Sequence, residues 1–271
     1  MVKTLLGISG GLESTYILWK LLSTTDDEVT PLYFDQSYIV NSQNTYQPDL
    51  SVIQPRKIRS VLSWVSSNVR PPQVIRTHVV NSPVANDSSS TYYIRVVAQY
   101  INDGSYDRVA FGWGARRQNG AGITTPDTNS GKTHQIYKDL MQTLTGNSSN
   151  LWFPITEWNA NTFKIVSELP SELFNISYSC IKPVIADDGN INECGECWKC
   201  HWKYLVKYKV DEGSLTAETF PSWIASQPDS VPYVKNGVSK SFDKTVWVNT
   251  FGNERKKYAS KGSIWEGAWS A

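Results

Sequence analysis

Four cysteines crowd into one short stretch of the chain, and their spacing points directly to metal chemistry. Cys194, Cys197 and Cys200 recur at every third position, Cys180 precedes them, and no other cysteine occurs. Disulfide scaffolds spread their cysteines to join distant segments of small secreted domains, whereas clustered thiolates are typical of metal sites. The spacing predicts a tetrahedral Zn²⁺ site with four sulfur ligands. Its role is structural, because no position stays open for a substrate.

Other interpretations of this cluster stay open on sequence alone. Free buried thiols or a pair of disulfides do not explain the Cys-x-x-Cys-x-x-Cys spacing, but an iron–sulfur cluster also uses closely spaced cysteines. His201 follows the last cysteine, and we expect it to be a bystander. We expect Trp198 and Trp202 to pack over the site.

A glycine-rich segment near the N-terminus could bind an anion. It reads Ser9-Gly10-Gly11-Leu12-Glu13-Ser14 and lies between an apolar stretch and a segment of helical periodicity. Glycines lack the Cβ atoms that would keep backbone N–H groups from converging on a phosphate, and a helix N-terminus adds a positive dipole end. The alternative is a tight turn in which Ser14 is the N-cap of the helix. We predict a nucleotide-phosphate site formed by Ile8, Ser9, Gly10, Gly11, Leu12, Glu13, Ser14 and Thr15.

The elements expected to position this loop follow an α/β pattern. Short apolar stretches alternate with segments of helical periodicity, as in a parallel sheet with crossover helices. The sequence therefore predicts a doubly wound parallel sheet of about five strands. The expected strands are 4–8, 29–34, 74–80, 108–113 and 151–155, and the expected helices are 14–22, 53–69, 91–101, 134–144 and 161–169.

Three regions are expected along the chain. Residues 1–170 form the nucleotide-binding α/β domain, residues 171–213 a small zinc-binding helical region, and residues 214–271 an aromatic-rich extension without a clear period. A polar, glycine-rich loop is expected between Arg116 and Ser130.

Composition and charge restrict the possible partners. The chain has 271 residues, of which 40% are hydrophobic and 19% charged, and its formal net charge is +1. This ordinary globular composition can bury one substantial core and gives no sign of a generally basic surface for nucleic acid. No apolar stretch reaches the length of a membrane span, and Met1–Ile8 does not resemble a secretory signal. We therefore expect a cytoplasmic protein that does not contact a membrane.

The glycine loop and the cysteine cluster together resemble one enzyme family. The loop is neither a Walker A motif nor a dinucleotide fingerprint, and it resembles the S-G-G-x-D-S loop of the PP-loop ATP pyrophosphatases. Ser179-Cys180, followed by Cys194-Gly195-x-Cys197-x-x-Cys200, is similar to the zinc segment of the 7-cyano-7-deazaguanine synthase (QueC) family. The resemblance covers about residues 1–207. Further matching landmarks are Phe34-Asp35, Arg95, Gly112, Pro126-Asp127 and Phe153-Pro154.

The resemblance implies the adenine nucleotide alpha-hydrolase-like version of the fold and an adenylating activity. Family members use ATP and Mg²⁺ to activate the carboxylate of 7-carboxy-7-deazaguanine; ammonia then gives the amide, and a second ATP the nitrile. In this chain the loop would bind ATP, Glu13 would help to hold Mg²⁺, and Arg95 would neutralise charge on the phosphates. For a lone arginine or aspartate, the alternative is a solvated surface position. The substrate residues implied are Asp35, Gly112 and Asp127, the last accepting hydrogen bonds from the base.

The chain also departs from the family pattern. Glu13 stands where the family has aspartate, and its extra methylene moves the carboxylate outward by about 1.5 Å. The family's Tyr-Gly-Gln-Arg-His run is missing, Arg117 replaces an aspartate, and Lys164 lies out of register with the family's lysine. These departures indicate a divergent member with room for a different second substrate.

Three functional hypotheses follow from these patterns. The first is a synthase that acts on a small deazaguanine substrate and ammonia. The second is an anti-phage defence enzyme that conjugates the activated deazaguanine to an amine of a partner protein, with the C-terminal extension as a docking surface. The third is a catalytically silent nucleotide-binding module. A tRNA-thiolating enzyme would need a catalytic cysteine besides the four, and a homodimer is compatible with each hypothesis.

Overall fold

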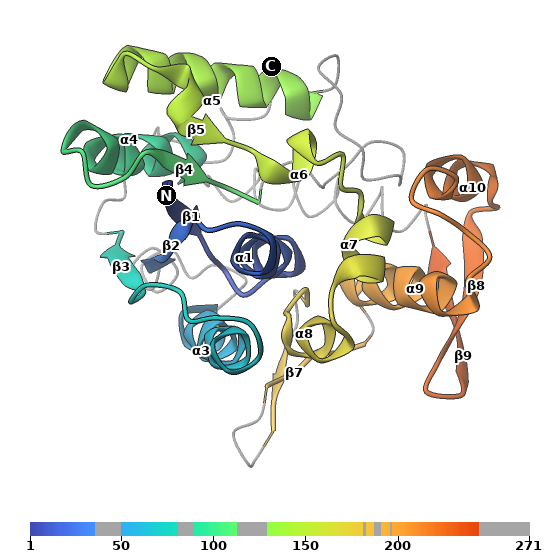
Figure 1. The fold of residues 1–271 in the computed structure, drawn as a ribbon. Coiled ribbons are helices and arrows are strands. Elements are labelled where there is room, and N and C mark those ends of the chain that lie inside the picture. The colour runs from blue at the N-terminus through green and yellow to red at the C-terminus, as the bar shows by residue number, and fades with distance from the viewer. Residues whose placement is uncertain are drawn as a thin grey trace, which may run out of the picture.

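Five parallel strands form the central sheet of the protein, in the order β3-β2-β1-β4-β5 (Figure 1). The computed structural model describes residues 1–35, 50–80, 89–112, 129–180, 183–186, 191–195 and 197–243. Strand β1 is paired on both sides, since Leu6 lies opposite Pro31 of β2 and Ala110 of β4. The strands are β1 (Lys3–Gly7), β2 (Glu28–Asp35), β3 (Arg76–Val79), β4 (Arg108–Ala110) and β5 (Leu151–Trp152).

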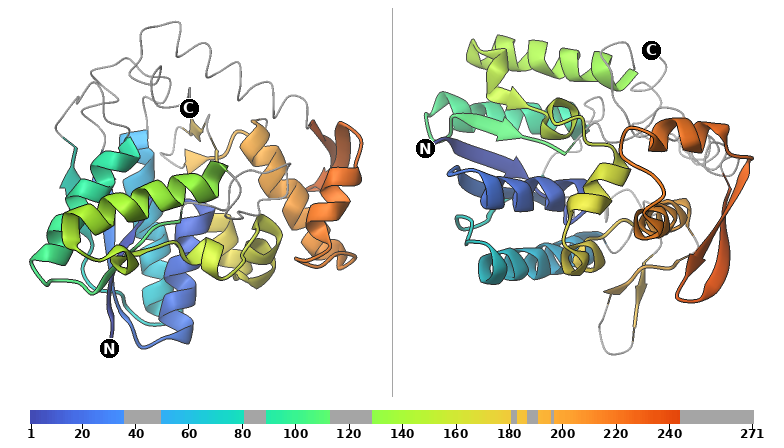
Figure 2. Two further views of the ribbon diagram at one scale, coloured as in Figure 1. Left: turned by 90° about the horizontal axis from the view of Figure 1, so that it is seen from above. Right: turned by 45° about the vertical axis from the view of Figure 1, so that its right-hand side comes forward.

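Helices cover both faces of this sheet, as the right-hand view of Figure 2 shows. Side chains alternate across a strand, so successive residues of β1 reach different cores. Leu6 is buried with residues of α1 and α3, whereas Leu5 is buried with residues of α4 and α5. The α/β architecture and its parallel sheet of five strands are therefore as predicted. These helices are α1 (Leu12–Thr24), α3 (Leu50–Asn68), α4 (Ser89–Asn102) and α5 (Asn129–Thr145).

The predicted strand ends are wrong at three strands. The predicted strand 151–155 ends at Trp152, because Pro154 has no N–H for a ladder and instead begins the short helix α6 (Pro154–Glu157). Strand β3 is shorter than the predicted 74–80, since its pairing with β2 begins at Arg76. Strand β4 is shorter than the predicted 108–113, of which position 113 lies outside the described residues.

The predicted helices are present, with small shifts at their ends. Helix α1 begins at Leu12 rather than Ser14, because Gly11 takes the N-cap position. The predicted helix 161–169 is α7 (Thr162–Glu168), which Asn161 caps by accepting a hydrogen bond from the Lys164 N–H at 2.9 Å. In the described part of the chain, no helix has the length and apolar character needed to cross a bilayer.

The chain beyond the sheet continues through helices and two small antiparallel hairpins (Figure 1). Within the predicted aromatic-rich extension, residues 214–243 fold as α10 and a hairpin against α9. Trp202 of α9 has its ring centroid 5.7 Å from Phe220 and 5.3 Å from Phe242. Positive φ angles at Asn236 and Gly237 suit the two-residue turn of this hairpin. Apart from η1 (Ser148–Asn150), which directly precedes β5, the remaining elements are α8 (Ser171–Ile176), β6 (Val184–Ile185), β7 (Ile191–Asn192), α9 (Trp198–Glu212), α10 (Phe220–Ser226), β8 (Ser230–Lys235) and β9 (Val238–Asp243).

Candidate functional site

The glycine loop lies where the strand order changes direction. From β1 the chain crosses through α1 to β2 on one side, whereas from β4 it continues through α5 to β5 on the other side. In open α/β sheets, ligands bind at this switch point, outside the carboxyl ends of the strands. Residues 8–11 follow β1 directly, and Gly112 comes shortly after β4. Two predicted segments of the site therefore lie at the same edge of the sheet.

Two glycines are required by the geometry at this edge. Gly10 has a φ of 72°, and a Cβ there would meet the Lys57 Cβ at 3.1 Å and the Ile58 nitrogen at 3.3 Å. A Cβ at Gly112 would lie 3.3 Å from the Ser14 nitrogen. Gly112 thus packs directly against the first turn of α1, and glycine permits this close approach.

The first turn of α1 has no side-chain cap. Gly11 at the N-cap offers no side-chain acceptor. The Ser14 hydroxyl bonds within the loop, accepting from the Ser9 N–H at 3.3 Å and donating to the Gly11 carbonyl at 3.2 Å. The alternative in which Ser14 is the N-cap is therefore wrong. The buried Thr15 Oγ1 has no hydrogen-bond partner among the described residues, which leaves a polar atom of the same turn unsatisfied.

Two charged side chains lie beside the loop. Glu13 Oε2 is 3.8 Å from the place that a Cβ would take at Gly11, so the carboxylate folds back over the loop. The half-buried Lys57 comes from α3 and contacts the loop near Gly10. Among the described residues Lys57 forms no ion pair.

The remaining predicted site residues are less closely grouped. Asp35 ends β2 at the same edge of the sheet, and burial together with the Asp35 charge raises the pKa of Tyr33 to about 12. Arg95 is exposed on α4, which packs on the other face of the sheet from α1. Asp127 lies outside the described residues.

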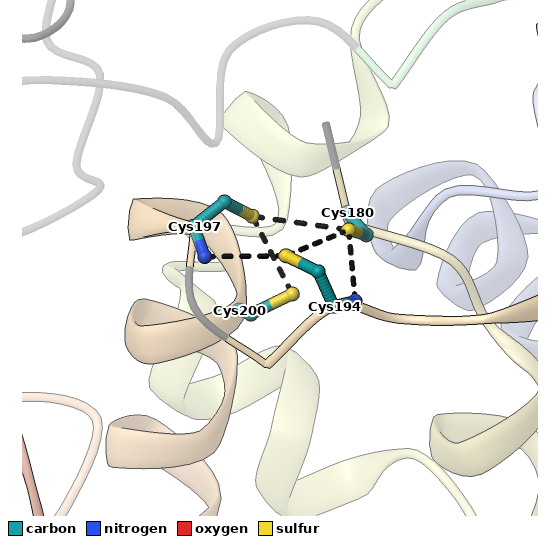
Figure 3. A group of neighbouring side chains, drawn as sticks. All are labelled: Cys180, Cys194, Cys197 and Cys200. Carbon is teal, nitrogen blue, oxygen red and sulfur yellow. Dashed lines mark hydrogen bonds between the residues drawn. The ribbon is translucent and has the colours of Figure 1, made fainter. Parts of the chain in front are cut away.

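The four predicted metal ligands meet in one cluster (Figure 3). Their Sγ atoms lie within 4.8 Å of one another, and the separation is 3.4 Å both between Cys180 and Cys194 and between Cys197 and Cys200. Ligands at about 2.3 Å from a tetrahedral Zn²⁺ lie about 3.8 Å apart, whereas a disulfide holds its sulfurs at about 2.0 Å. None of the four cysteines forms a disulfide, so the disulfide alternative is wrong. The spacing fits a single ion better than a multi-iron cluster, whose irons and sulfides would separate the ligands.

The surroundings of the sulfurs favour thiolates bound to a cation. The Cys194 N–H donates to Cys180 Sγ and the Cys197 N–H to Cys194 Sγ, both at 3.3 Å. Cys197 is the N-cap of α9, whose dipole stabilises negative charge. The neighbouring Cys180 and Cys197 sulfurs and burial raise the pKa of the Cys200 thiol. A bound divalent cation would reverse that effect, because it favours the thiolate form.

A buried ion pair adjoins the cluster. Lys203 is 2% exposed, and its Nζ donates to the Glu193 carboxylate at 3.1 Å and to the Ser177 carbonyl at 2.8 Å. The same carboxylate accepts from the Tyr204 hydroxyl at 3.1 Å. Burial lowers the pKa of Lys203, and the Glu193 charge opposes this shift. The pair satisfies its charges internally, as buried charges require.

No protein-family model matches the sequence, and no curated protein matches it. The motifs and the geometry of this chain are therefore the grounds for its function.

Several residues at the site were not predicted from the sequence. Lys57 lies on a helix with several basic residues. In such a sequence, a lysine beside a binding site cannot be distinguished from a lysine on the solvated surface. Glu193 and Lys203 are charged residues, which are rarely buried, so no sequence signal marks them as interior. His201 is not among the four clustered ligands, and its Nδ1 lies 2.6 Å from the Tyr233 hydroxyl.

Proposed function

We propose that this chain is an ATP-dependent enzyme of the PP-loop pyrophosphatase type, which adenylates a carboxylate and carries a structural zinc ion. The observation that carries the proposal is the glycine loop at the switch point, where Gly10 has a positive φ and Gly112 packs against the first turn of α1. A helix start without a side-chain cap, reached by a loop of glycines, suits the β- and γ-phosphates of a nucleotide.

Different residues at the glycine loop would bind the phosphates and the Mg²⁺ ion of the nucleotide. The N–H groups and dipole of the first turn of α1 would hold the phosphates, with Lys57 supplying a positive charge near Gly10. The Glu13 carboxylate beside the loop would be a ligand of Mg²⁺, which prefers oxygen ligands and keeps several waters. The Mg²⁺ ion would neutralise phosphate charge. Arg95 would stabilise charge developing on the phosphates only if the bound nucleotide reaches α4.

The reaction that we propose is adenylation followed by amide formation. A carboxylate oxygen of the substrate forms a bond to the α-phosphorus, the bond from that phosphorus to its bridging oxygen breaks, and pyrophosphate leaves. An amine nitrogen then attacks the activated carbonyl carbon, loses a proton to solvent and displaces AMP. The motif resemblance supports 7-carboxy-7-deazaguanine as the carboxylate and ammonia as the amine. An amine of a partner protein is the second candidate.

The cysteine cluster takes no part in this chemistry. A closed set of four sulfur ligands leaves no coordination site for a substrate. Zinc would instead join the segment that carries Cys180 to the start of α9, which carries Cys197 and Cys200. The proposed role is therefore structural.

Mass spectrometry of the products tests this proposal. The protein is incubated with ATP, Mg²⁺ and 7-carboxy-7-deazaguanine, with and without ammonium. AMP together with an ammonium-dependent amide or nitrile is the expected result. AMP without such a product favours a protein amine as the acceptor, and an absence of turnover with ATP still bound favours a silent nucleotide-binding module. If ATP does not bind at all, the nucleotide proposal is overturned.

A further inference from the structure

The glycine loop and the cysteine cluster are joined by one short segment, residues 177–180. The Tyr178 N–H donates to the Gly10 carbonyl at 2.8 Å, and Tyr178 forms a parallel bridge with Gly11. A Cβ at Gly11 would lie 3.5 Å from the Tyr178 carbonyl oxygen, so the two backbones are close. Cys180, a member of the sulfur cluster, follows only two residues later. A displacement of Cys180 would therefore be transmitted to the glycine loop through Tyr178, two residues away.

The buried ion pair holds this same segment from the other side. Lys203 donates to the Ser177 carbonyl at 2.8 Å, and Glu193 accepts from the Ser179 N–H at 2.7 Å. The carbonyl before Tyr178 and the N–H after it are thus both bound by side chains of one ion pair.

The ion pair is also tied to the metal ligands by the chain itself. Glu193 immediately precedes Cys194, and Lys203 lies on α9 one turn beyond Cys200. Closing four sulfurs around an ion fixes the start of α9 and the segment before it, and this places both charges. The link is continuous from the sulfurs to the ion pair, then to Tyr178, then to the glycine loop.

We propose that Glu193 and Lys203 are positioning residues that couple metal binding at the cysteine cluster to phosphate binding at the glycine loop. This inference rests on the proposed nucleotide-binding role of the loop. Metal binding orders the segment around Tyr178, and the ordered segment holds the Gly10 and Gly11 backbone in its phosphate-binding form. Buried ion pairs add little net stability, and in some proteins they are retained because they specify one arrangement.

The coupling has a quantitative signature, because linkage between two binding sites is reciprocal. If zinc raises the affinity for ATP by some factor, ATP raises the affinity for zinc by the same factor. We expect a factor of about 5 to 150, which is the usual range for coupled sites. Titration calorimetry of the full chain would measure ATP binding with and without zinc, and competition with a chelator would measure zinc binding with and without ATP.

Variants of the ion pair test the route of the coupling in the zinc-loaded protein. Glu193→Gln and Lys203→Met keep all four sulfurs, so we expect full zinc content, weaker ATP binding and faster hydrogen exchange at the Tyr178 amide. The matched control is Lys207→Met on the same helix, whose partner Asp211 is exposed. The control should leave ATP binding and hydrogen exchange at the Tyr178 amide unchanged. Glu193→Gln keeps the volume of the side chain and one acceptor oxygen while removing the charge, so it serves if Lys203→Met does not fold.

The outcomes separate this inference from the proposed function. A merely structural role would lower the thermal unfolding midpoint of the variants and leave the zinc-dependent ratio of ATP affinities unchanged. ATP binding of equal strength with and without zinc, together with unchanged Tyr178 exchange in Glu193→Gln, would overturn the coupling and leave the nucleotide proposal standing. A protein that binds no ATP, with or without zinc, would overturn the nucleotide proposal. Faster hydrogen exchange at Tyr178 after zinc removal would then still show that the cysteine cluster orders the segment around Tyr178.

Discussion

The His201 Nδ1 and the Tyr233 hydroxyl lie 2.6 Å apart, and this contact ties the C-terminal hairpin to the helix of the cysteine cluster. His201 directly follows the ligand Cys200, and Tyr233 lies on β8 with 2% of its surface exposed. Lys235 of the same strand lies 3.6 Å from the centroid of the Tyr204 ring on α9. The hairpin is therefore fixed to α9 at two points near the cysteine cluster.

The Tyr233→Phe substitution tests the importance of this contact. It removes the hydroxyl that lies 2.6 Å from the His201 Nδ1, so the free energy of unfolding should fall by about 0.5–1.5 kcal/mol. Urea denaturation of the zinc-loaded protein measures the change. Tyr208→Phe on α9 is the control; its hydroxyl interacts with the exposed Glu212, so its loss should change stability by less than about 0.5 kcal/mol. An equal effect of both substitutions would show that the hairpin contact is not specific.

Removal of one sulfur ligand tests the metal centre. Cys197→Ala leaves three ligands and should lose zinc and lower the thermal unfolding midpoint, because a structural metal contributes directly to folding. His201→Ala is the matched control, since the structure places this side chain against Tyr233 rather than in the cluster. Metal analysis should find full zinc content in the histidine variant. Full zinc content and normal melting in Cys197→Ala would refute the assignment.

The sequence predicted the sheet because a parallel strand covered on both faces is a short continuous apolar stretch. Leu5 and Leu6 are both fully buried, on opposite faces of β1, as a strand covered on two sides requires. The cysteine site was equally accessible, since all of its ligands lie within a short stretch of sequence. What the sequence could not provide is the contact between Tyr178 and Gly10, which are far apart in the chain and meet through backbone atoms that carry no residue-specific signal.

Replacement of Gly10 tests the phosphate loop, and the chain supplies a matched control in Gly104. Both glycines have a φ of 72°, but a Cβ at Gly104 meets nothing within 4 Å, whereas one at Gly10 approaches Lys57 and Ile58. Alanine at either position should cost about 1–2 kcal/mol of stability from the left-handed backbone. Only Gly10→Ala should abolish ATP binding in titration calorimetry. Normal ATP affinity in Gly10→Ala would contradict the proposal that the glycine loop binds the phosphates.

The acid dependence of stability should contain a contribution from Glu168. Burial of this carboxyl favours its neutral form, but hydrogen bonds from Lys20 and Tyr16 prevail and hold the pKa of Glu168 below the ordinary value of 4.5. The contribution is therefore complete above pH 4.5 and is lost as the pH falls through the lower pKa of the folded state. Glu168→Gln should lower stability at pH 7 and reduce its loss under acid. Urea denaturation across this pH range measures both, and Glu172→Gln on α8 is the control.

Lys57 offers the sharpest test of where the phosphates bind. Its Cβ lies 3.1 Å from the place that a Cβ would take at Gly10, so the charge is within reach of an anion on the loop. Lys57→Met keeps most of the side-chain volume and should weaken ATP binding about tenfold or more, since a charged hydrogen bond contributes about 1.5–3 kcal/mol. The loss of one charge should also reduce the salt dependence of binding. Arg59→Met, an exposed position on the same helix, should bind ATP normally. Equal ATP affinity in both variants would show that the phosphates bind away from Gly10, and α4 with Arg95 would then be the next candidate for the phosphate site.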